Sequence, residues 1–89
     1  MNEWFVYIAE CGDGTLYTGY TNDVERRILF HNLGKGARFT RSRLPVKLLW
    51  SEKYGTQSEA LKREAQIKGW TRKKKASLIS GDLVESKKI

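Results

Sequence analysis

Five side chains of this sequence carry groups that could cleave a phosphodiester bond with the help of a metal ion. They are two phenols, one guanidinium, the imidazole of the only histidine and one carboxylate: Tyr7, Tyr17, Arg27, His31 and Glu64. A metal ion and a guanidinium can neutralise charge on a phosphate, and a phenol or an imidazole can take a proton from water. Each residue is ordinary alone, so the prediction depends on the elements that position them.

The two tyrosines lie in segments that predict a β-hairpin. Its strands are predicted over residues 4–9 and 16–20, on either side of the turn Gly12-Asp13-Gly14. A three-residue loop with Gly14 in the left-handed conformation pairs Tyr7 with Gly19 and puts Tyr17 on the same face. A loop of even length would separate the tyrosines, because a one-residue slip reverses every side chain. Gly19 then leaves room beside the phenols for a backbone or phosphate, or else marks a bulge.

Residues 23–33 predict a helix that carries the guanidinium and the imidazole. The residues Thr21-Asn22-Asp23 offer helix caps, Glu25 lies three residues after Asn22 as in a capping box, and Gly34 is a suitable stop. Arg27 and His31 fall on one stripe together with two aliphatic residues, so each needs a buried partner or a function. Alternatively, Arg27 extends from the edge of the stripe into solvent.

The second half of the chain predicts a loop at 35–45, a buried strand at 46–50, a helix at about 58–69 and a short last helix. Glu64 falls on the apolar side of the longer helix, where a carboxylate is unfavourable unless it is paired or binds a metal. Its spacing leaves two alternatives open, a metal ligand or a buried ion pair with Arg27.

Basic residues are concentrated in the later segments. The formal net charge is +7, and residues 1–34 contain two Lys or Arg against five Asp or Glu, whereas residues 35–89 contain fifteen against five. This asymmetry favours nucleic acid as a partner, with lysine-based solubility as the alternative. Candidate contacts to nucleic acid are the basic side chains and the aromatic ring of the loop and the last helix: Lys35, Arg38, Phe39, Arg41, Arg43, Lys73, Lys74 and Lys75. A solvated charge run is the plainer interpretation of the last three.

Length and composition predict one small domain. Residues 1–79 form this domain and residues 80–89 a weakly ordered tail. The expected fold class is α/β, more closely α+β: a small three-stranded, mainly antiparallel sheet flanked by helices, in the order β-β-α-β-α with a possible further helix. Cys11 is the only cysteine, which excludes an internal disulfide and a cysteine-based zinc site. Without a leader or a long apolar segment, we expect a cytoplasmic protein with no membrane partner.

The ordered motifs resemble the GIY-YIG nuclease superfamily. Val6-Tyr7-Ile8 and Tyr17-Thr18-Gly19 stand where its two signature triplets would be, and Arg27, His31 and Glu64 match its later positions. The segment from His31 through Gly34-Lys35-Gly36-Ala37 is similar to short members of the UPF0213 type and to the catalytic domain of Slx-type structure-specific endonucleases. The likeness covers roughly residues 4–79.

The resemblance implies hydrolysis of nucleic acid, DNA more than RNA, with one divalent cation held by Glu64. Mg²⁺ or Mn²⁺ is the implied ion, and Arg27 would stabilise the charge of the transition state. Tyr7 would be the general base, with its pKa lowered by the cation and Arg27, while His31 assists or serves as the base itself. Tyr17 would position water or phosphate. A structure-selective substrate and a role in DNA repair or recombination are the expected context.

Two departures from the family pattern bear on this expectation. Tyr20 stands where some members carry lysine, and no asparagine follows Asn32. The alternative is a nucleic-acid-binding module or adaptor without catalysis, in which the basic side chains contact phosphates and Phe39 stacks on a base. Targeting would depend on these basic segments or on a protein partner.

Overall fold

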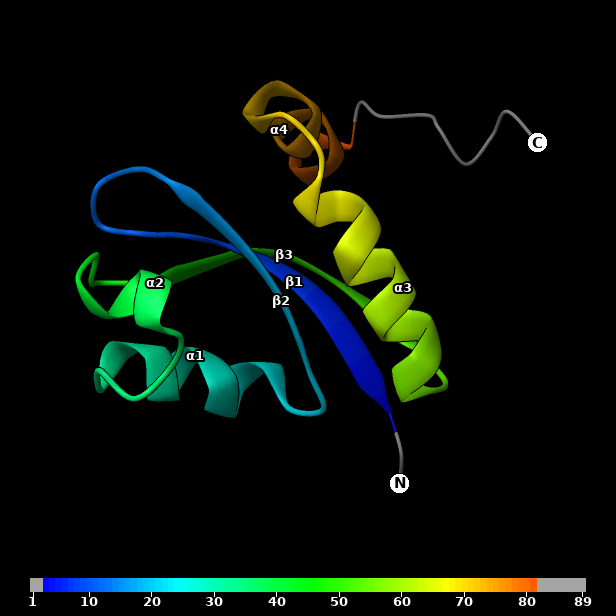
Figure 1. Cartoon of the computed structure of the whole chain (residues 1–89), viewed down its shortest axis with the longest axis horizontal. Coiled ribbons are helices and arrows are strands. Elements are labelled where there is room, and N and C mark those ends of the chain that lie inside the picture. Colours follow the sequence, from blue (N-terminus) through cyan, green and yellow to red (C-terminus); the bar gives the residue numbers. More distant parts are fainter. Residues whose placement is uncertain (1–2, 82–89) are drawn as a thin grey trace.

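A three-stranded sheet with β1 at its centre organises the fold. The computed structural model describes residues 3–81. Its elements in chain order are β1 (Trp4–Glu10), β2 (Leu16–Thr21), α1 (Val24–Asn32), α2 (Arg38–Arg41), β3 (Lys47–Tyr54), α3 (Gln57–Lys68) and α4 (Arg72–Ser80). Both outer strands run antiparallel to β1, in the spatial order β2-β1-β3 (Figure 1). The predicted α+β fold class and order of elements are confirmed.

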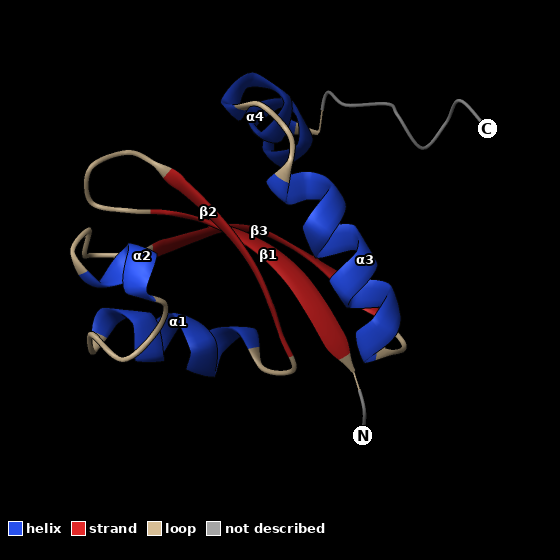
Figure 2. Cartoon of the chain, viewed as in Figure 1, coloured by secondary structure: helices blue, strands red, loops and turns tan. Residues whose placement is uncertain are grey.

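Helices cover both faces of the sheet (Figure 2). Val6 and Ile8 of β1 pack toward α3 on one face, in the larger hydrophobic cluster. Tyr7 and Ala9 point to the opposite face and pack with Ile28 of α1. Because alternate residues of a strand point to opposite faces, β1 is buried on both sides, as its apolar sequence predicts.

The hairpin has the predicted register. Tyr7 pairs with Gly19 across β1 and β2. The turn between them has three residues: the Cys11 carbonyl accepts from Gly14 N at 2.9 Å, and Cys11 N donates to the Thr15 carbonyl at 2.8 Å. Gly14 has a φ of 87°, which favours glycine. The odd loop length therefore places both tyrosines on one face, with ring centroids 6.3 Å apart.

The structure uses the last of the three caps that the sequence offers for α1, and not the one of the capping box. Asp23, not Asn22, precedes the helix, and its Oδ1 accepts from Arg26 N at 3.1 Å. The Asn22–Glu25 capping box is therefore wrong by one residue, since either residue type can accept this bond.

The segment after α1 also differs. Residues 38–41 of the predicted loop form the short helix α2, and its Thr40 is fully buried. β3 is longer than predicted and less buried: Leu48 is 38% exposed. The predicted third strand is confirmed, but the burial predicted for 46–50 holds only in part, since Val46 is buried and Trp50 packs against the larger cluster whereas Lys47 and Leu48 are exposed.

The two C-terminal helices follow the sheet as predicted, with small shifts in their bounds. The helix predicted at about 58–69 is α3, and the short last helix is α4, which ends at Ser80. Most of the predicted tail, residues 82–89, lies outside the described residues. Within residues 3–81, no helix combines the length and the apolar character needed to cross a membrane.

Candidate active site

A chain of three hydrogen bonds runs through the buried face of the sheet beside α1. The hydroxyl of Tyr7 lies 2.9 Å from Nε2 of His31, and Nδ1 of His31 lies 2.7 Å from Oγ1 of Thr40. The Thr40 hydroxyl in turn donates to the Ala37 carbonyl at 2.9 Å. Tyr7, His31 and Thr40 are each at most 1% exposed, so water does not compete for these bonds.

These bonds assign the tautomer of His31. A threonine hydroxyl has one hydrogen. Because Thr40 donates it to Ala37, its oxygen must accept from Nδ1–H of His31. The neutral imidazole then presents Nε2 as an acceptor, and the Tyr7 hydroxyl donates to it. The chain therefore points the proton of the Tyr7 phenol toward a base.

Two glycines give the rings of this chain their space. A Cβ on Gly19 would lie 2.6 Å from the Tyr7 hydroxyl oxygen, and a Cβ on Gly36 would overlap Nδ1 of His31. Contacts this close would force a ring to shift. The room that Gly19 leaves is thus occupied by the Tyr7 ring itself, and an approach of phosphate beside it stays a prediction. The Gly34-Lys35-Gly36-Ala37 segment forms the wall behind the imidazole.

Arg27 provides positive charge next to both ends of the Tyr7–His31 bond. Burial raises the pKa of Tyr7 to about 12, while the hydrogen bond and charge of Arg27 act in the opposite direction. Burial also lowers the pKa of His31, and the charge of Arg27 lowers it further. At neutral pH the structure therefore holds a protonated phenol against a neutral imidazole. The expected effect of Arg27 on this pKa is present but is outweighed by burial, and the expected effect of a cation stays a prediction.

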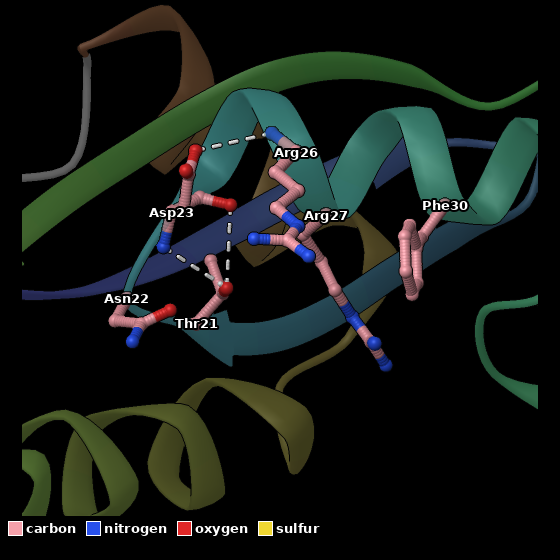
Figure 3. A pocket seen from close by; sticks show the side chains of 6 residues that line it. All are labelled: Thr21, Asn22, Asp23, Arg26, Arg27 and Phe30. Atoms are coloured by element: carbon pink, nitrogen blue, oxygen red, sulfur yellow. Dashed lines mark hydrogen bonds between the residues drawn. The ribbon is translucent and has the colours of Figure 1, made fainter.

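A polar pocket of about 350 Å³ opens beside Arg27. Figure 3 shows its lining, which combines the turn between β2 and α1 with three side chains from one side of α1: Thr21, Asn22, Asp23, Arg26, Arg27 and Phe30. The Asp23 carboxylate caps the helix there. The guanidinium groups of Arg26 and Arg27 therefore line one pocket, and its single carboxylate, Asp23, already accepts a backbone hydrogen bond. This arrangement suits an anionic ligand.

Glu64 lies on the buried side of α3, as predicted, and is 8% exposed. Its Oε2 forms an ion pair with Nζ of Lys68 at 3.0 Å, one turn along the helix. The alternative ion pair with Arg27 is not formed. The negative charge of Glu64 contributes to the raised pKa of Tyr7, so the carboxylate lies within electrostatic reach of the phenol.

The donor set at Glu64 fits a hard divalent cation. Within the part of the chain that the structure describes, no cluster of three or more His, Cys, Asp or Glu side chains could hold a metal ion. A single carboxylate suits Mg²⁺ or Mn²⁺, because such ions keep several waters and bind through one or two carboxylates plus substrate phosphates. The residues present thus match a cation with one protein ligand.

Tyr17 completes an aromatic cluster with the Tyr7–His31 pair. Its ring centroid lies 5.3 Å from that of His31, in an edge-on arrangement, and the ring also stacks on Phe39 at 5.9 Å. Arg43 lies over Phe39 at 4.0 Å and donates to the Phe39 carbonyl at 2.8 Å. Its Nε also lies 3.1 Å from a carboxylate oxygen of Asp13. Arg43 is therefore engaged within the protein.

The other predicted contacts to nucleic acid differ in their exposure. Lys35, Arg38 and Arg41 are exposed around α2. In α4, Lys73 is exposed, whereas Lys74 lies over the Trp70 ring at 4.5 Å and Lys75 is buried. The run of cations thus divides between solvent, an aromatic ring and the interior, and whether any of them binds nucleic acid stays a prediction.

Known proteins match the chain over nearly its whole length. A model of the GIY-YIG catalytic domain matches residues 3–77. The chain belongs to the GIY-YIG family. This GIY-YIG domain is 52% identical over 80 residues to a UPF0213 protein of Staphylococcus saprophyticus, covering 90% of the chain and 98% of the relative. It is 56% identical over 79 residues to a UPF0213 protein of Staphylococcus aureus, covering 89% of the chain and 96% of the relative.

Two solution NMR structures are similar to this GIY-YIG domain. A UPF0213 protein of Bacillus halodurans is 46% identical with a TM-score of 0.57, covering 88% of this chain and 83% of that one. A protein of E. faecalis is 41% identical with a TM-score of 0.61, covering 91% and 86% respectively. The match to the GIY-YIG domain places the chain in a nuclease superfamily. The UPF0213 relatives confirm that it is a UPF0213-like member.

Thr40 is the member of this GIY-YIG site that sequence reasoning missed. It lies three residues after Ala37 in a segment interpreted as a basic loop, and no periodicity marks it as buried. We expect Thr40→Val to leave the Nδ1–H of His31 without an acceptor, which costs about 1–3 kcal/mol of unfolding free energy. It should also shift the imidazole toward the other tautomer. Because the chain has one histidine, ¹⁵N NMR of that imidazole reports the change directly.

The matched control for this prediction is Thr40→Ser, which keeps the hydroxyl and should keep the wild-type tautomer. An unchanged imidazole spectrum in Thr40→Val would show that the assignment of the proton to Nδ1 is wrong. Chemical denaturation of the same samples gives the change in stability.

Proposed function

We propose that this GIY-YIG domain is a metal-dependent nuclease that hydrolyses DNA phosphodiester bonds, acts on nicked, flapped or branched structures and serves DNA repair or recombination in the cytoplasm. The supporting observation is the buried chain from Tyr7 through His31 to Thr40, with Arg27 beside it. Such a chain provides a proton acceptor next to a positive charge, as phosphodiester hydrolysis requires.

In the proposed mechanism, proton transfer runs through Tyr7 to His31. A water molecule attacks phosphorus while the Tyr7 oxygen takes its proton, and the phenol proton moves to Nε2 of His31. The bond between phosphorus and the leaving oxygen breaks as the new bond forms. With a pKa near 12, Tyr7 is a poor base alone, so the transfer depends on the neutral imidazole behind it.

Arg27 and Glu64 have separate proposed roles. The Arg27 guanidinium stabilises the negative charge that develops on the phosphate oxygens. Glu64 would hold the divalent cation, which would supply charge neutralisation at the scissile phosphate. Tyr17 positions water or phosphate from its place against the His31 ring. The pocket that Arg26 and Arg27 line offers a place for the phosphate backbone of the DNA.

The proposal is tested by Tyr7→Phe on a panel of end-labelled nicked, flapped, branched and single-stranded DNAs, with Mg²⁺, Mn²⁺ or EDTA. We expect the wild type to cleave at least one structure in a metal-dependent manner and the variant to lose about 10²-fold or more in rate. Loss of the hydroxyl removes the donor to Nε2 of His31 but leaves the ring packing intact.

Tyr20→Phe is the matched control, because Tyr20 is half-buried on the opposite face of the hairpin against Trp4. It should cleave at the wild-type rate. Equal rates in the two phenylalanine variants would remove Tyr7 from the mechanism, and a wild type that cleaves none of the DNAs would contradict the function.

Two observations favour a second candidate, a nucleic-acid-binding module without catalysis. The Glu64 carboxylate is already paired with Lys68, and the Tyr7 phenol is held protonated. In that case exposed Lys35, Arg38 and Arg41 would supply salt-dependent binding to DNA or RNA. Binding without cleavage, unchanged by Tyr7→Phe, would identify this function.

A further inference from the structure

A second cavity, of about 300 Å³, adjoins the proposed active site between the hairpin, α2 and the two C-terminal helices. Its lining combines two ammonium groups, one threonine hydroxyl and three apolar or aromatic side chains, one of them a tyrosine: Leu16, Tyr17, Thr18, Phe39, Lys68 and Lys75. No acidic residue lines it. The Lys68 ammonium is paired with Glu64, which lies outside this lining, so the cavity gathers a hydrogen-bond donor and more positive charge than its surroundings balance.

Lys75 is the unusual member of this lining. It is 9% exposed, although lysine is almost never buried without a partner. Among residues 3–81, no carboxylate forms an ion pair with it. Burial lowers the pKa of Lys75, and the positive charge of Lys68 lowers it further. Two like charges thus face one cavity, an arrangement that binding of an anion would stabilise.

Thr18 provides an independent indication of a ligand. The residue is 2% exposed, and its Oγ1 is buried without a hydrogen-bond partner. A buried hydroxyl in that state is unfavourable by about 1–3 kcal/mol. A group with acceptor oxygens in the cavity would satisfy it.

The surroundings of the cavity suggest what carries these oxygens. Tyr17 and Phe39 form a stacked wall, with an interplanar angle of 23°, and such a wall suits a sugar or a base. Lys68 connects the cavity to the proposed metal ligand through its ion pair with Glu64. Tyr17 also belongs to the cluster around His31. A nucleotide held here would therefore lie next to the reacting groups.

We propose that this cavity is a phosphate subsite for the nucleotide adjacent to the cleaved bond, with Lys68, Lys75 and Thr18 as its ligands and Phe39 against the sugar or base. The assignment of the nucleotide to the substrate rests on the proposed function. Binding of the phosphate itself depends only on the cavity, whose lining residues carry ammonium and hydroxyl donors for acceptor oxygens.

The first test measures binding of a short fluorescent single-stranded DNA by anisotropy in EDTA, so that cleavage plays no part. Lys75→Met keeps the volume of the side chain and removes its charge. We expect the affinity for this DNA to fall about tenfold. The slope of log affinity against log salt concentration should become shallower by about 1, as for the loss of one phosphate contact. Thr18→Val should lower affinity while leaving thermal stability equal or higher, because it removes an unpaired buried hydroxyl.

Lys62→Met is the control, since Lys62 is an exposed lysine of α3 outside the cavity. It should change affinity by less than about twofold. Equal weakening by Lys62→Met and Lys75→Met, or full affinity in Lys75→Met, would overturn the subsite. So would full affinity in Thr18→Val, which distinguishes a ligand from general charge.

A second measurement needs no variant. Wild-type protein is titrated with inorganic phosphate against sodium chloride of matched ionic strength and followed by amide NMR. Shifts centred on Thr18, Lys68 and Lys75 support the subsite, and shifts that are absent or centred elsewhere overturn it. If DNA binds at this cavity but Mg²⁺ produces no cleavage, the nuclease proposal fails and the subsite stands. If cleavage occurs and Lys75→Met binds and cleaves normally, the subsite alone fails.

Discussion

Glu64→Gln is expected to abolish cleavage, with a loss of at least about 10³-fold at any concentration of Mg²⁺ near that used for the wild type. Glutamine keeps the shape of the side chain and one acceptor oxygen, but it removes the charge that the proposed cation needs. Cleavage rates over a series of Mg²⁺ and Mn²⁺ concentrations measure the effect. A partial return of activity at very high metal concentration would fit weakened binding.

The fold should survive this change. Glu64 is buried, so neutralising it removes a costly charge, while the Lys68 partner is 55% exposed and can return to water. Glu59→Gln is the control, because Glu59 is exposed in the first turn of the same helix. Undiminished cleavage by Glu64→Gln, with a normal melting curve, would remove the metal-ligand role.

The second large effect is expected from pH. The neutral imidazole of His31 accepts the Tyr7 proton, so protonation of Nε2 should stop the proposed transfer. Because the pKa of His31 is lowered by burial and by Arg27, the rate should stay high somewhat below pH ~6.5. Below the pKa of the folded protein it should fall about tenfold per pH unit. Single-turnover rates from neutral to mildly acidic pH measure this limb.

Stability should follow the same group with a definite sign. Unfolded His31 takes up a proton near pH ~6.5, before the folded protein does, so the unfolded state binds more protons in that window. The free energy of unfolding should therefore decline as pH falls through ~6.5 and continue to decline to the lower pKa of the folded state. NMR titration of the single imidazole locates that pKa. A titration midpoint of His31 above pH ~6.5 would contradict the expected fall in cleavage rate below that pH. It would also contradict the lowered pKa of His31 from which that fall is derived.

The hairpin and the buried carboxylate were predictable because local rules determine them. Loop length and a left-handed glycine set the pairing of Tyr7 with Gly19. Helical periodicity placed Glu64 on the inner face of α3. These patterns depend on neighbours a few residues away, so the sequence contains them.

Residues whose roles depend on distant segments could not be predicted in the same way. Thr40 is important because its hydroxyl meets His31, nine residues earlier, after a chain reversal that no local pattern specifies. In the sequence, Thr18 is only the middle residue of a signature triplet. Its unpaired hydroxyl, and the cavity that it lines together with Lys75 of α4, depend on the three-dimensional structure. From the sequence, the alternative to a metal ligand at Glu64 was an ion pair with Arg27. The structure pairs Glu64 with Lys68, which lies one helical turn further along α3.

The hairpin turn is held by segments from two other parts of the chain. Gly12 N donates to the carbonyl of Arg43 at 2.6 Å, and the Arg72 guanidinium donates to the carbonyl of Gly14, also at 2.6 Å. Arg43 follows α2 and Arg72 begins α4, so both ends of the turn are clamped from outside the hairpin. The smallest fragment that preserves the site must therefore include α4, although none of the five proposed catalytic residues lies in that helix.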